Sequence, residues 1–553
     1  MPYPVGMQES IKNVESTRPS RLNQEFNRLE LSEKARLLED YHPDYRTGSK
    51  APIPLGPNSD ELVPVELVEL LKSPSRLNPA EINLAKVDYR TDVLIIGGGG
   101  GGATAALIAA ENGARVLLAT KLRLGDSNTI MAEGGIGAAT MPEDSPVIHW
   151  IDTMMGGRFQ NKPELVEALV TDAPFIVSWL ADLGVNFDRN PDGSFETHMP
   201  GGHSRKRSHS VKDLTGLEIM RVLGDEIRNR EIEVLEFSPA IELILDNNGQ
   251  CAGAVLLNLD TGQHLVVESQ TTIVCTGGMG RLHPNGFPTS NHYGATADGI
   301  VMAYRAGAKL LHPGFVQYHP TGAAWPEQML GLLISEALRA QNAQLVNSNG
   351  DMFVYRLETR DAVASAIIRE CSDRGKGVLT PTGMTGVWLD TPLIDMICGQ
   401  GTFLRRFAGI HGRFKKYDID PIKEPILIYP TQHYQNGGVE ISAGGETNIP
   451  NLYMAGEVTG GIHGHNRLGS NSLQDIFVFG RRAGRQAAEK SRHVKIGELS
   501  LQHIKSYNNM LRDEHLATDK VSPLILPEYR FEKALTKIQH LKGNQRPQAE
   551  LEV

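Results

Sequence analysis

Residues 92–110 read Asp92-Val93-Leu94-Ile95-Ile96, then six glycines from Gly97 to Gly102, then Ala103-Thr104-Ala105-Ala106-Leu107-Ile108-Ala109-Ala110. The apolar run before the glycines predicts a buried strand, and the alanine-rich run after them predicts a helix. Gly113 ends that helix, and the apolar stretch 114–119 predicts a second strand. This order of strand, turn, helix and strand is a βαβ unit, so we expect an α/β fold.

The glycines of the turn have the spacing of a dinucleotide-binding site. Gly97, Gly99 and Gly102 fit the pattern G-x-G-x-x-G, and Gly100 lies between them. The first glycine permits a tight turn, the second lets a pyrophosphate approach the backbone, and the third allows close packing of helix and strand. The helix that follows offers unpaired N–H groups to the phosphates. We therefore expect a bound dinucleotide.

The second strand lacks the acidic residue that usually holds the adenosine ribose. It ends in Ala119-Thr120-Lys121. This departure counts against a plain NAD site, and it leaves the ribose to Thr120, Lys121 or a later segment.

Two later segments have the form of further parts of the same fold. Residues 272–278 are a strand ending in small residues, among them Thr276 and Gly277, that suit close passage beside a cofactor. Residues 451–457 repeat that form and close on Glu457, an acid that could bind cofactor hydroxyls. A nucleotide fold that resumes so far along the chain implies an inserted domain between its halves.

Composition limits the classes of protein to which the chain can belong. It has 553 residues, 40% of them hydrophobic and 22% charged, with a net charge of −10. This describes a globular protein of two or three domains and disfavours a nucleic-acid partner. No apolar run is long enough for a membrane span, and the start of the chain lacks the layout of a secretory signal. The four cysteines are scattered, which fits a reducing cytoplasm and excludes an iron–sulfur cluster ligated by this chain alone.

Residues 1–90 differ from the rest of the chain because they are polar and rich in proline. Short helices are predicted from Leu29 to Leu38 and from Val65 to Leu71. The pentapeptide Pro-Ser-Arg-Leu-Asn occurs twice, at 19–23 and at 74–78. Either this repeat is chance in a low-complexity arm, or each copy contacts a partner; the sequence leaves both open.

Several motifs together resemble the flavoprotein subunits of the succinate dehydrogenase/fumarate reductase family, which also contains L-aspartate oxidase. They are Gly97–Gly102, Ala132–Ile136, Asp213–Gly216, Thr296–Gly299, Gln317–Gly322, Arg360-Asp361, His433-Tyr434 and His463–Leu473. The resemblance covers about residues 91–490. It implies a Rossmann-like FAD-binding domain at 91–309 and 431–490, interrupted by an α+β capping domain at 310–430. An extended N-terminal arm (1–90) and a short C-terminal helical segment (491–553) complete this organisation.

The resemblance also implies a site for a C4-dicarboxylate. His319 and Ser335 match the positions that bind one carboxylate, with Ser335 in place of the usual threonine. His433 and Arg467 match the pair that binds the other. Arg360 matches the residue that delivers the proton. Arginine is an unusual acid, and the family supplies it through an Arg–Glu–Arg relay to which Arg339, Glu336 and Arg360 correspond.

The cofactor implied is FAD, held non-covalently. Asn128 stands where many members carry the histidine that bonds to FAD, and an amide cannot make that bond. Glu133 replaces the usual glutamine near the flavin. The resemblance, taken with the glycine turn and the later strands, gives these further cofactor positions: Ser127, Asn128, Thr129, Gly134, Gly135, Asp298, Ser470, Ser472 and Leu473.

The predicted function is hydride transfer between FAD and fumarate or succinate, with a bias toward fumarate reduction. The alternatives are L-aspartate oxidase, suggested by Gly201–Ser204 and Ile334–Arg339, reduction of another enoate, and a non-catalytic FAD-bearing scaffold, which should have lost clamp or relay residues. The partners that the resemblance implies are an iron–sulfur subunit with further electron-transfer chains. We expect a cytoplasmic location, or attachment to the inner membrane face through such partners, and no bound metal.

Overall fold

A computed structural model describes residues 3–516, 518–527 and 529. Its larger sheet has eight strands in the order β21-β9-β10-β11-β3-β4-β8, with β19 also paired to β11. The strands around β3 are parallel, and β9, β10 and β21 add antiparallel pairs at one side. The bounds are β3 Tyr89–Ile96, β4 Val116–Ala119, β8 Glu233–Leu235, β9 Ala240–Asp246, β10 Cys251–Leu257, β11 His264–Val274, β19 Leu452–Met454 and β21 Leu499–Ser500. The predicted βαβ unit therefore lies in the parallel part of a mixed sheet, and the fold of this part of the chain is α/β, as predicted.

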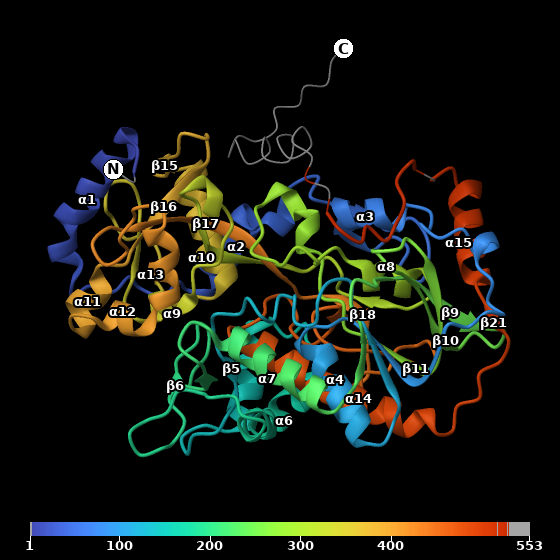
Figure 1. The fold of residues 1–553 in the computed structure, drawn as a ribbon. Coiled ribbons are helices and arrows are strands. Elements are labelled where there is room, and N and C mark those ends of the chain that lie inside the picture. Colours follow the sequence, from blue (N-terminus) through green and yellow to red (C-terminus); the bar gives the residue numbers. More distant parts are fainter. Residues whose placement is uncertain (1–2, 517, 528, 530–553) are drawn as a thin grey trace, which may run out of the picture.

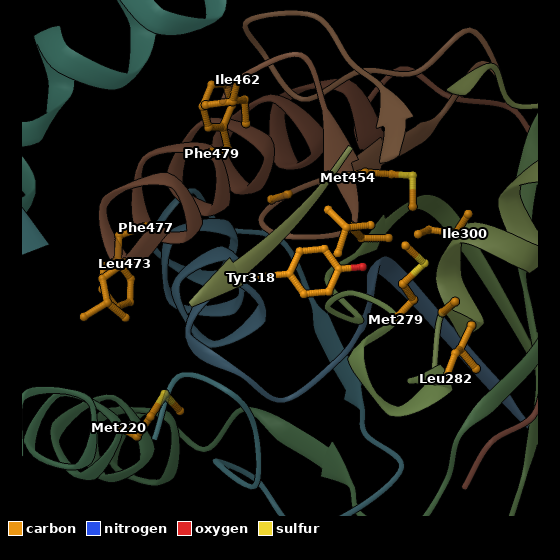
Figure 2. Close-up of a cluster of buried hydrophobic side chains, with 14 of the residues drawn as sticks. Met220, Met279, Leu282, Ile300, Tyr318, Met454, Ile462, Leu473, Phe477 and Phe479 are labelled. Atoms are coloured by element: carbon orange, nitrogen blue, oxygen red, sulfur yellow. The ribbon is translucent and has the colours of Figure 1, made fainter. Parts of the chain in front are cut away.

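Helices cover both faces of this sheet (Figure 1). Helices α4 and α14 cross closely because glycines meet at their contact: a Cβ on Gly480 would lie 2.6 Å from the carbonyl oxygen of Gly101. Figure 2 shows part of the core, in which Phe477 and Phe479 of α14 and Met454 of β19 are fully buried. The helices around this sheet are α3 Val65–Leu71, α4 Gly100–Glu111, α5 Pro146–Gly156, α6 Pro163–Asp182, α7 Thr215–Asn229, α8 Asp298–Arg305, α14 Asn471–Ser491 and α15 Gln502–Asp513.

A second sheet of five strands is antiparallel, in the order β13-β17-β16-β14 with β15 beside β16. Its strands are β13 Val316–Ala323, β14 Gln344–Val346, β15 Val378–Leu379, β16 Thr385–Asp390 and β17 Ile426–Gln435. The helices in this part of the chain are α9 Glu336–Ala340, α10 Arg360–Ser372, α11 Leu393–Cys398, α12 Thr402–Arg406 and α13 Ala408–Lys415. Small sheets complete the fold: β1 Lys50–Pro52 with β2 Leu62–Pro64; β5 Ile136–Gly137, β6 Thr197–His198 and β7 Ser208–His209; β12 Leu310–Leu311, β18 Gly438–Glu440 and β20 Thr459–Gly460.

The N-terminal arm is more ordered than its composition suggests. Helix α1 (Val5–Arg21) was not predicted, and it lies against the second sheet (Figure 1). Arg18 and Arg21 each reach the buried carboxylate of Asp390 at the end of β16, at 2.9 and 2.8 Å. Helix α2 (Leu31–Tyr41) begins two residues later than predicted, because Glu30 caps it. Helix α3 has the predicted bounds.

The two copies of the repeated pentapeptide lie in different surroundings within the chain. The first copy ends α1, where Gln344 donates to the Arg21 carbonyl at 3.0 Å. In the second, the N–H of Arg76 donates to the Ser522 carbonyl at 2.8 Å. Because the two copies bind unlike neighbours, the repeat carries no shared structural role within this chain.

The end of the chain adds one strand and one helix to the described structure. Strand β21, which was not predicted, joins the edge of the larger sheet, and α15 follows it. Of the rest of the predicted C-terminal helical segment, residues 514–516, 518–527 and 529 are not helical, and residues 517, 528 and 530–553 lie outside the described residues. Among the described helices, none is both long and apolar enough to cross a membrane.

Candidate active site

The glycine turn sits between the carboxyl end of β3 and the start of α4. Gly97 has a φ of +119°, and a Cβ there would lie 2.3 Å from the carbonyl oxygen of Cys275. A Cβ on Gly102 would lie 1.8 Å from the carbonyl oxygen of Gly97. Only glycine fits either position, so the turn brings bare backbone against the neighbouring strand. Gly99 caps α4, and the N–H of Gly100 donates to Thr129 Oγ1 at 3.1 Å.

A cavity of about 500 Å³ extends from this turn to the second sheet. It is lined by every predicted cofactor residue except Gly102: Gly97, Gly99, Gly100, Thr120, Lys121, Ser127, Asn128, Thr129, Gly134, Gly135, Thr276, Gly277, Asp298, Glu457, Ser470, Ser472 and Leu473. The same cavity is lined by His319, Ser335, Glu336, Arg360, His433 and Arg467. Arg339 lies behind this wall. The residues expected to hold the cofactor and those expected to hold the substrate thus line one cavity.

The nucleotide end of the cavity suits a dinucleotide. Lys121 Nζ donates to Asp298 Oδ2 at 2.5 Å and to the carbonyl oxygen of Ile525 at 2.5 Å. A Cβ on Gly135 would clash with the His209 carbonyl oxygen at 2.3 Å, so this wall too is bare backbone. Thr276 Oγ1 is buried and finds no partner among the described residues. Bare backbone beside a helix N-terminus is the arrangement that binds the pyrophosphate of a dinucleotide.

Asn128 is held by two hydrogen bonds. Its Nδ2 donates to Glu457 Oε2 at 3.1 Å, and its Oδ1 accepts from the N–H of His292 at 2.5 Å. Burial raises the pKa of Glu457 to about 7. Asn128 therefore joins Glu457 to the backbone at His292 through its two hydrogen bonds.

At the other end of the cavity, two histidines face one another from neighbouring strands. His319 of β13 and His433 of β17 have ring centroids 5.0 Å apart. Burial lowers the pKa of each well below its ordinary 6.5, and Arg360 (for His319) or Arg467 (for His433) lowers it further. Both rings are therefore neutral. The N–H of Thr321 donates to His319 Nδ1 at 3.2 Å, which leaves the proton on Nε2.

Ser335 and Arg467 complete the predicted clamps. Ser335 caps α9, where its Oγ accepts from the N–H of Ala337 at 3.3 Å. Arg467 is 2% exposed, and its guanidinium lies 4.6 Å from the ring centroid of Tyr434. Its Nε is buried and finds no acceptor in the described part of the chain. Burial, then the charge of Arg360, lowers its pKa to about 9.

The three predicted relay residues form one hydrogen-bonded row. Glu336 Oε2 accepts from Arg360 Nε at 2.9 Å and from an Arg339 terminal nitrogen at 3.1 Å. Its Oε1 accepts from the N–H of Gly201 at 2.7 Å. Burial alone would raise the pKa of Glu336, but the two guanidinium groups hold it well below its usual range. Arg339 is fully buried, and burial lowers its pKa to about 10.

Two residues of the site were not among those predicted from the sequence. Gln317 Oε1 accepts from Arg467 at 2.9 Å and from Arg360 at 3.2 Å, so one amide oxygen holds both guanidinium groups. Tyr434 lies under Arg467 and donates to Asp475 at 2.9 Å. Both residues belong to motifs that carry the family resemblance: Gln317 lies two positions before His319, and Tyr434 directly follows His433. Strand alternation, which places residues i and i+2 on one face, could have found Gln317.

Glu133, the residue that departs from the usual glutamine, forms an ion pair with Arg413 of α13. The pair joins the loop after the glycine turn to a helix beside the second sheet. Burial raises the pKa of Glu133 to about 7.

Comparisons with known proteins identify the family of the chain. Residues 92–473 match the family described as FAD binding domain. The chain is 39% identical over 444 residues to one of the subunits of the fumarate reductase (CoM/CoB) of Methanothermobacter marburgensis, covering 77% of this chain and 78% of that protein. It is 35% identical over 404 residues to the L-aspartate oxidase of Streptomyces coelicolor, covering 71% and 67%. Among solved structures, FrdA of E. coli quinol fumarate reductase superposes with a TM-score of 0.69 at 31% identity, covering 77% of this chain and 74% of that one.

The family match spans residues 92–473, which include the glycine turn, and the Methanothermobacter and E. coli proteins each match 77% of this chain. The chain is therefore an FAD-binding flavoprotein oxidoreductase that belongs to the family of fumarate reductase/succinate dehydrogenase flavoprotein subunits and L-aspartate oxidases.

Proposed function

We propose that this chain reduces fumarate to succinate, or catalyses the reverse reaction. The observation that supports this most is the charge of the buried end of the cavity. Among the clamp and relay residues, the guanidinium groups of Arg339, Arg360 and Arg467 and the carboxylate of Glu336 carry charge, which gives this group of residues a net charge of +2. A dianion of two carboxylates neutralises that charge, and burial without such a partner is costly.

Each carboxylate of the substrate has its own pair of donors in this proposal. His319, with its proton on Nε2, and Ser335 bind one carboxylate. His433 and Arg467 bind the other, and the free Nε of Arg467 is a donor available to it. Because both histidines are neutral, they hydrogen-bond the substrate without adding charge. Polarising both ends of the alkene makes it electron-poor and ready to accept a hydride.

The glycine turn and the residues around Glu457 would hold FAD, which supplies or accepts the hydride when bound. We propose that the attachment is non-covalent, because Asn128 is an amide already bonded to Glu457 and His292. Thr120 and Lys121 are the candidates for the ribose, and the Lys121–Asp298 ion pair fixes that end of the cavity.

The proton follows the row of three relay residues. Arg360 gives a proton to the substrate carbon, and Glu336, 2.9 Å away, passes one back to it. Arg339, which has a terminal nitrogen 3.1 Å from Glu336 Oε2, then returns a proton to Glu336. Glu336 is ionised at rest because its pKa is low, so it carries the proton only in passing.

The domains have separate tasks in this proposal. Residues 91–309 and 431–490 hold FAD, and residues 310–430 form the cap that brings His319, Ser335 and the relay over it. The described residues of the N-terminal arm (3–90) and of the C-terminal segment (491–516, 518–527 and 529) pack against these parts. The names of two relatives, each of them one of the subunits of a fumarate reductase, support a role as one subunit of a complex. An iron–sulfur subunit is the partner that this role requires, and further chains would carry any membrane attachment.

The test is to reduce the purified flavoprotein anaerobically and follow flavin absorbance as fumarate is added. Rapid reoxidation with formation of succinate is expected. In Arg360→Ala we expect turnover to be abolished while FAD stays bound, and Arg228→Ala, an exposed residue of α7, serves as the control. Reoxidation of Arg360→Ala at a near-normal rate would refute the relay.

L-aspartate oxidase is the second candidate, because one relative carries that name at 35% identity. Aspartate brings an ammonium group into a site whose net charge is already +2. The carboxylate of Glu336 is already bonded to two guanidinium groups and a backbone N–H. The charge of the site therefore favours fumarate. If fumarate fails to reoxidise the flavin, the production of iminoaspartate from L-aspartate decides between the two.

A further inference from the structure

The relay ends, on the side away from the cavity, in the N-terminal arm. Arg339 is fully buried, and its Nη1 donates to the carbonyl oxygen of Arg356 at 2.5 Å. Arg356 Nη1 donates in return to the carbonyl oxygen of Arg339 at 2.6 Å. This reciprocal clasp fixes both side chains. The other terminal nitrogen of Arg356 forms an ion pair with Glu25 of the arm at 2.9 Å.

The arm holds the loop 353–360 at two further points. Lys34 of α2 forms an ion pair with the buried Glu358 at 3.2 Å, two residues before Arg360. The guanidinium of Arg28 lies 5.0 Å from the ring centroid of Tyr355. Three arm residues within ten positions therefore bind three residues of the loop that joins Arg339 to Arg360.

The rest of the arm anchors this contact on both sides. Before it, Arg18 and Arg21 bind the fully buried Asp390 of the second sheet. After it, Tyr41 donates to Asp373, just beyond the end of α10, the helix that Arg360 begins. Figure 1 shows α1 and α2 lying along this part of the molecule. The segment 25–34 is thus fixed at one end against β16 of the second sheet and at the other against the end of α10, the helix that carries Arg360.

We propose that residues 25–34 of the arm are a positioning element for the proton relay, acting on Arg339 through Arg356 and on Arg360 through Glu358. This inference rests on the proposed function, since the relay is part of it. None of the arm residues touches the cavity, so they act by holding the donor in place. Misplacing a reacting group by about 1 Å can lower a rate by about a hundredfold.

The Glu25–Arg356 contact contributes little to the stability of the fold, because the side chain of Glu25 is 60% exposed. Lys34 is the partner of the buried Glu358, so replacing Lys34 leaves that carboxylate unpaired and costs more stability. Flavin content and thermal unfolding are therefore measured on every Lys34 variant, and Glu25→Gln alone tests positioning without that cost.

The experiment compares the double variant Glu25→Gln/Lys34→Gln with the wild type and with Glu15→Gln. Glu15 lies exposed on α1 and forms no ion pair among the described residues, so it is a matched control. With reduced enzyme and fumarate, kcat of the double variant should fall about tenfold, with KM within about twofold because the clamps are untouched. The solvent isotope effect on kcat should rise, since proton delivery becomes slower than hydride transfer. Glu15→Gln should match the wild type in all three quantities.

A charge exchange tests whether the Lys34–Glu358 contact itself matters. Lys34→Glu alone should lower kcat, and Lys34→Glu combined with Glu358→Lys should recover most of it. An unchanged kcat and isotope effect in the double variant, or no recovery in the exchange, would overturn the inference.

Hydrogen exchange of the peptide 353–360 separates this inference from the proposed function. If the wild type does not turn over fumarate, the proposed function fails on its own account. The arm then remains a positioning element only if that peptide exchanges faster in the double variant while the glycine turn does not. Equal exchange in both proteins would overturn it.

Discussion

Replacing Gln317 by leucine tests whether one amide oxygen holds the two cationic ends of the site. Gln317 is 2% exposed; its Oε1 accepts from Arg467 and Arg360, and its Nε2 donates to the Arg467 carbonyl oxygen at 2.6 Å. Leucine fills similar space but leaves both guanidinium groups without this acceptor in a buried place.

The magnitude follows from these bonds. A hydrogen bond to a charged group contributes about 1.5–3 kcal/mol, and about 1.4 kcal/mol corresponds to a tenfold change. Losing the acceptor of Arg467 alone therefore predicts that kcat/KM for fumarate falls by about 10- to 150-fold. Gln317→Glu keeps an acceptor but lowers the net charge of the site from +2 to +1. In that variant KM should rise more than kcat falls, because the dianion is attracted less.

The assay is anaerobic turnover of fumarate with a reduced viologen dye as electron donor. Flavin content and thermal unfolding are measured on the same samples. Gln250→Leu is the control, because the Gln250 amide bonds Asp246 outside the cavity. If Gln317→Leu retains kcat/KM within about twofold of the wild type, Gln317 does not organise the two arginines.

Three further predictions concern the cofactor end of the cavity. Gly97→Ala should yield protein without bound flavin, because a Cβ would meet the Cys275 carbonyl oxygen at 2.3 Å and φ is +119°; a normal flavin absorbance would contradict this. Acid precipitation of the wild type should release all the flavin into the supernatant, because Asn128 offers no covalent link, and yellow colour in the pellet would show that a link exists. Burial raises the pKa of Glu457 from its ordinary 4.5 to about 7, so the native chain binds that proton more tightly than the unfolded chain. The stability contributed by the proton is present at low pH and is lost as pH rises between about 4.5 and 7. In FAD-free protein, Glu457→Gln should flatten the curve of unfolding free energy against pH between about pH 4.5 and 7. An unchanged slope would show that other groups cause the loss of stability in that range.

Local patterns were enough to predict the nucleotide turn. The strand before Gly97 and the helix after it are set by short-range sequence, and β3 and α4 lie where they were expected. Helix α1 could not be read in the same way. Its polar residues dominate its composition, Pro19 lies in its last turn, and its strongest contacts are to Asp390, far along the chain. Tertiary contacts, rather than propensity, form that helix.

In the site, too, some features could be predicted from short motifs and others depend on tertiary contacts. His319, His433, Arg467 and the relay could be named from motifs, and all of them except Arg339, which lies behind the wall, line one cavity. What the motifs did not reveal is how these residues hold one another. The shared acceptor of Gln317 and the clasp between Arg339 and Arg356 depend on side chains meeting across distant segments.

The parallel sheet that carries the glycine turn is completed late in synthesis. Strand β19 pairs with β11, and α14 packs on α4, yet both come after the whole second sheet in the chain. A nascent chain that stops before β19 has the glycine turn but lacks the wall formed by Glu457, Ser470 and Leu473. Enclosure of the flavin therefore has to wait until most of the polypeptide has left the ribosome. The contacts that finish the domain are long-range, and such contacts form slowly. A chain released without flavin has every segment of this wall and still encloses a cavity of about 500 Å³.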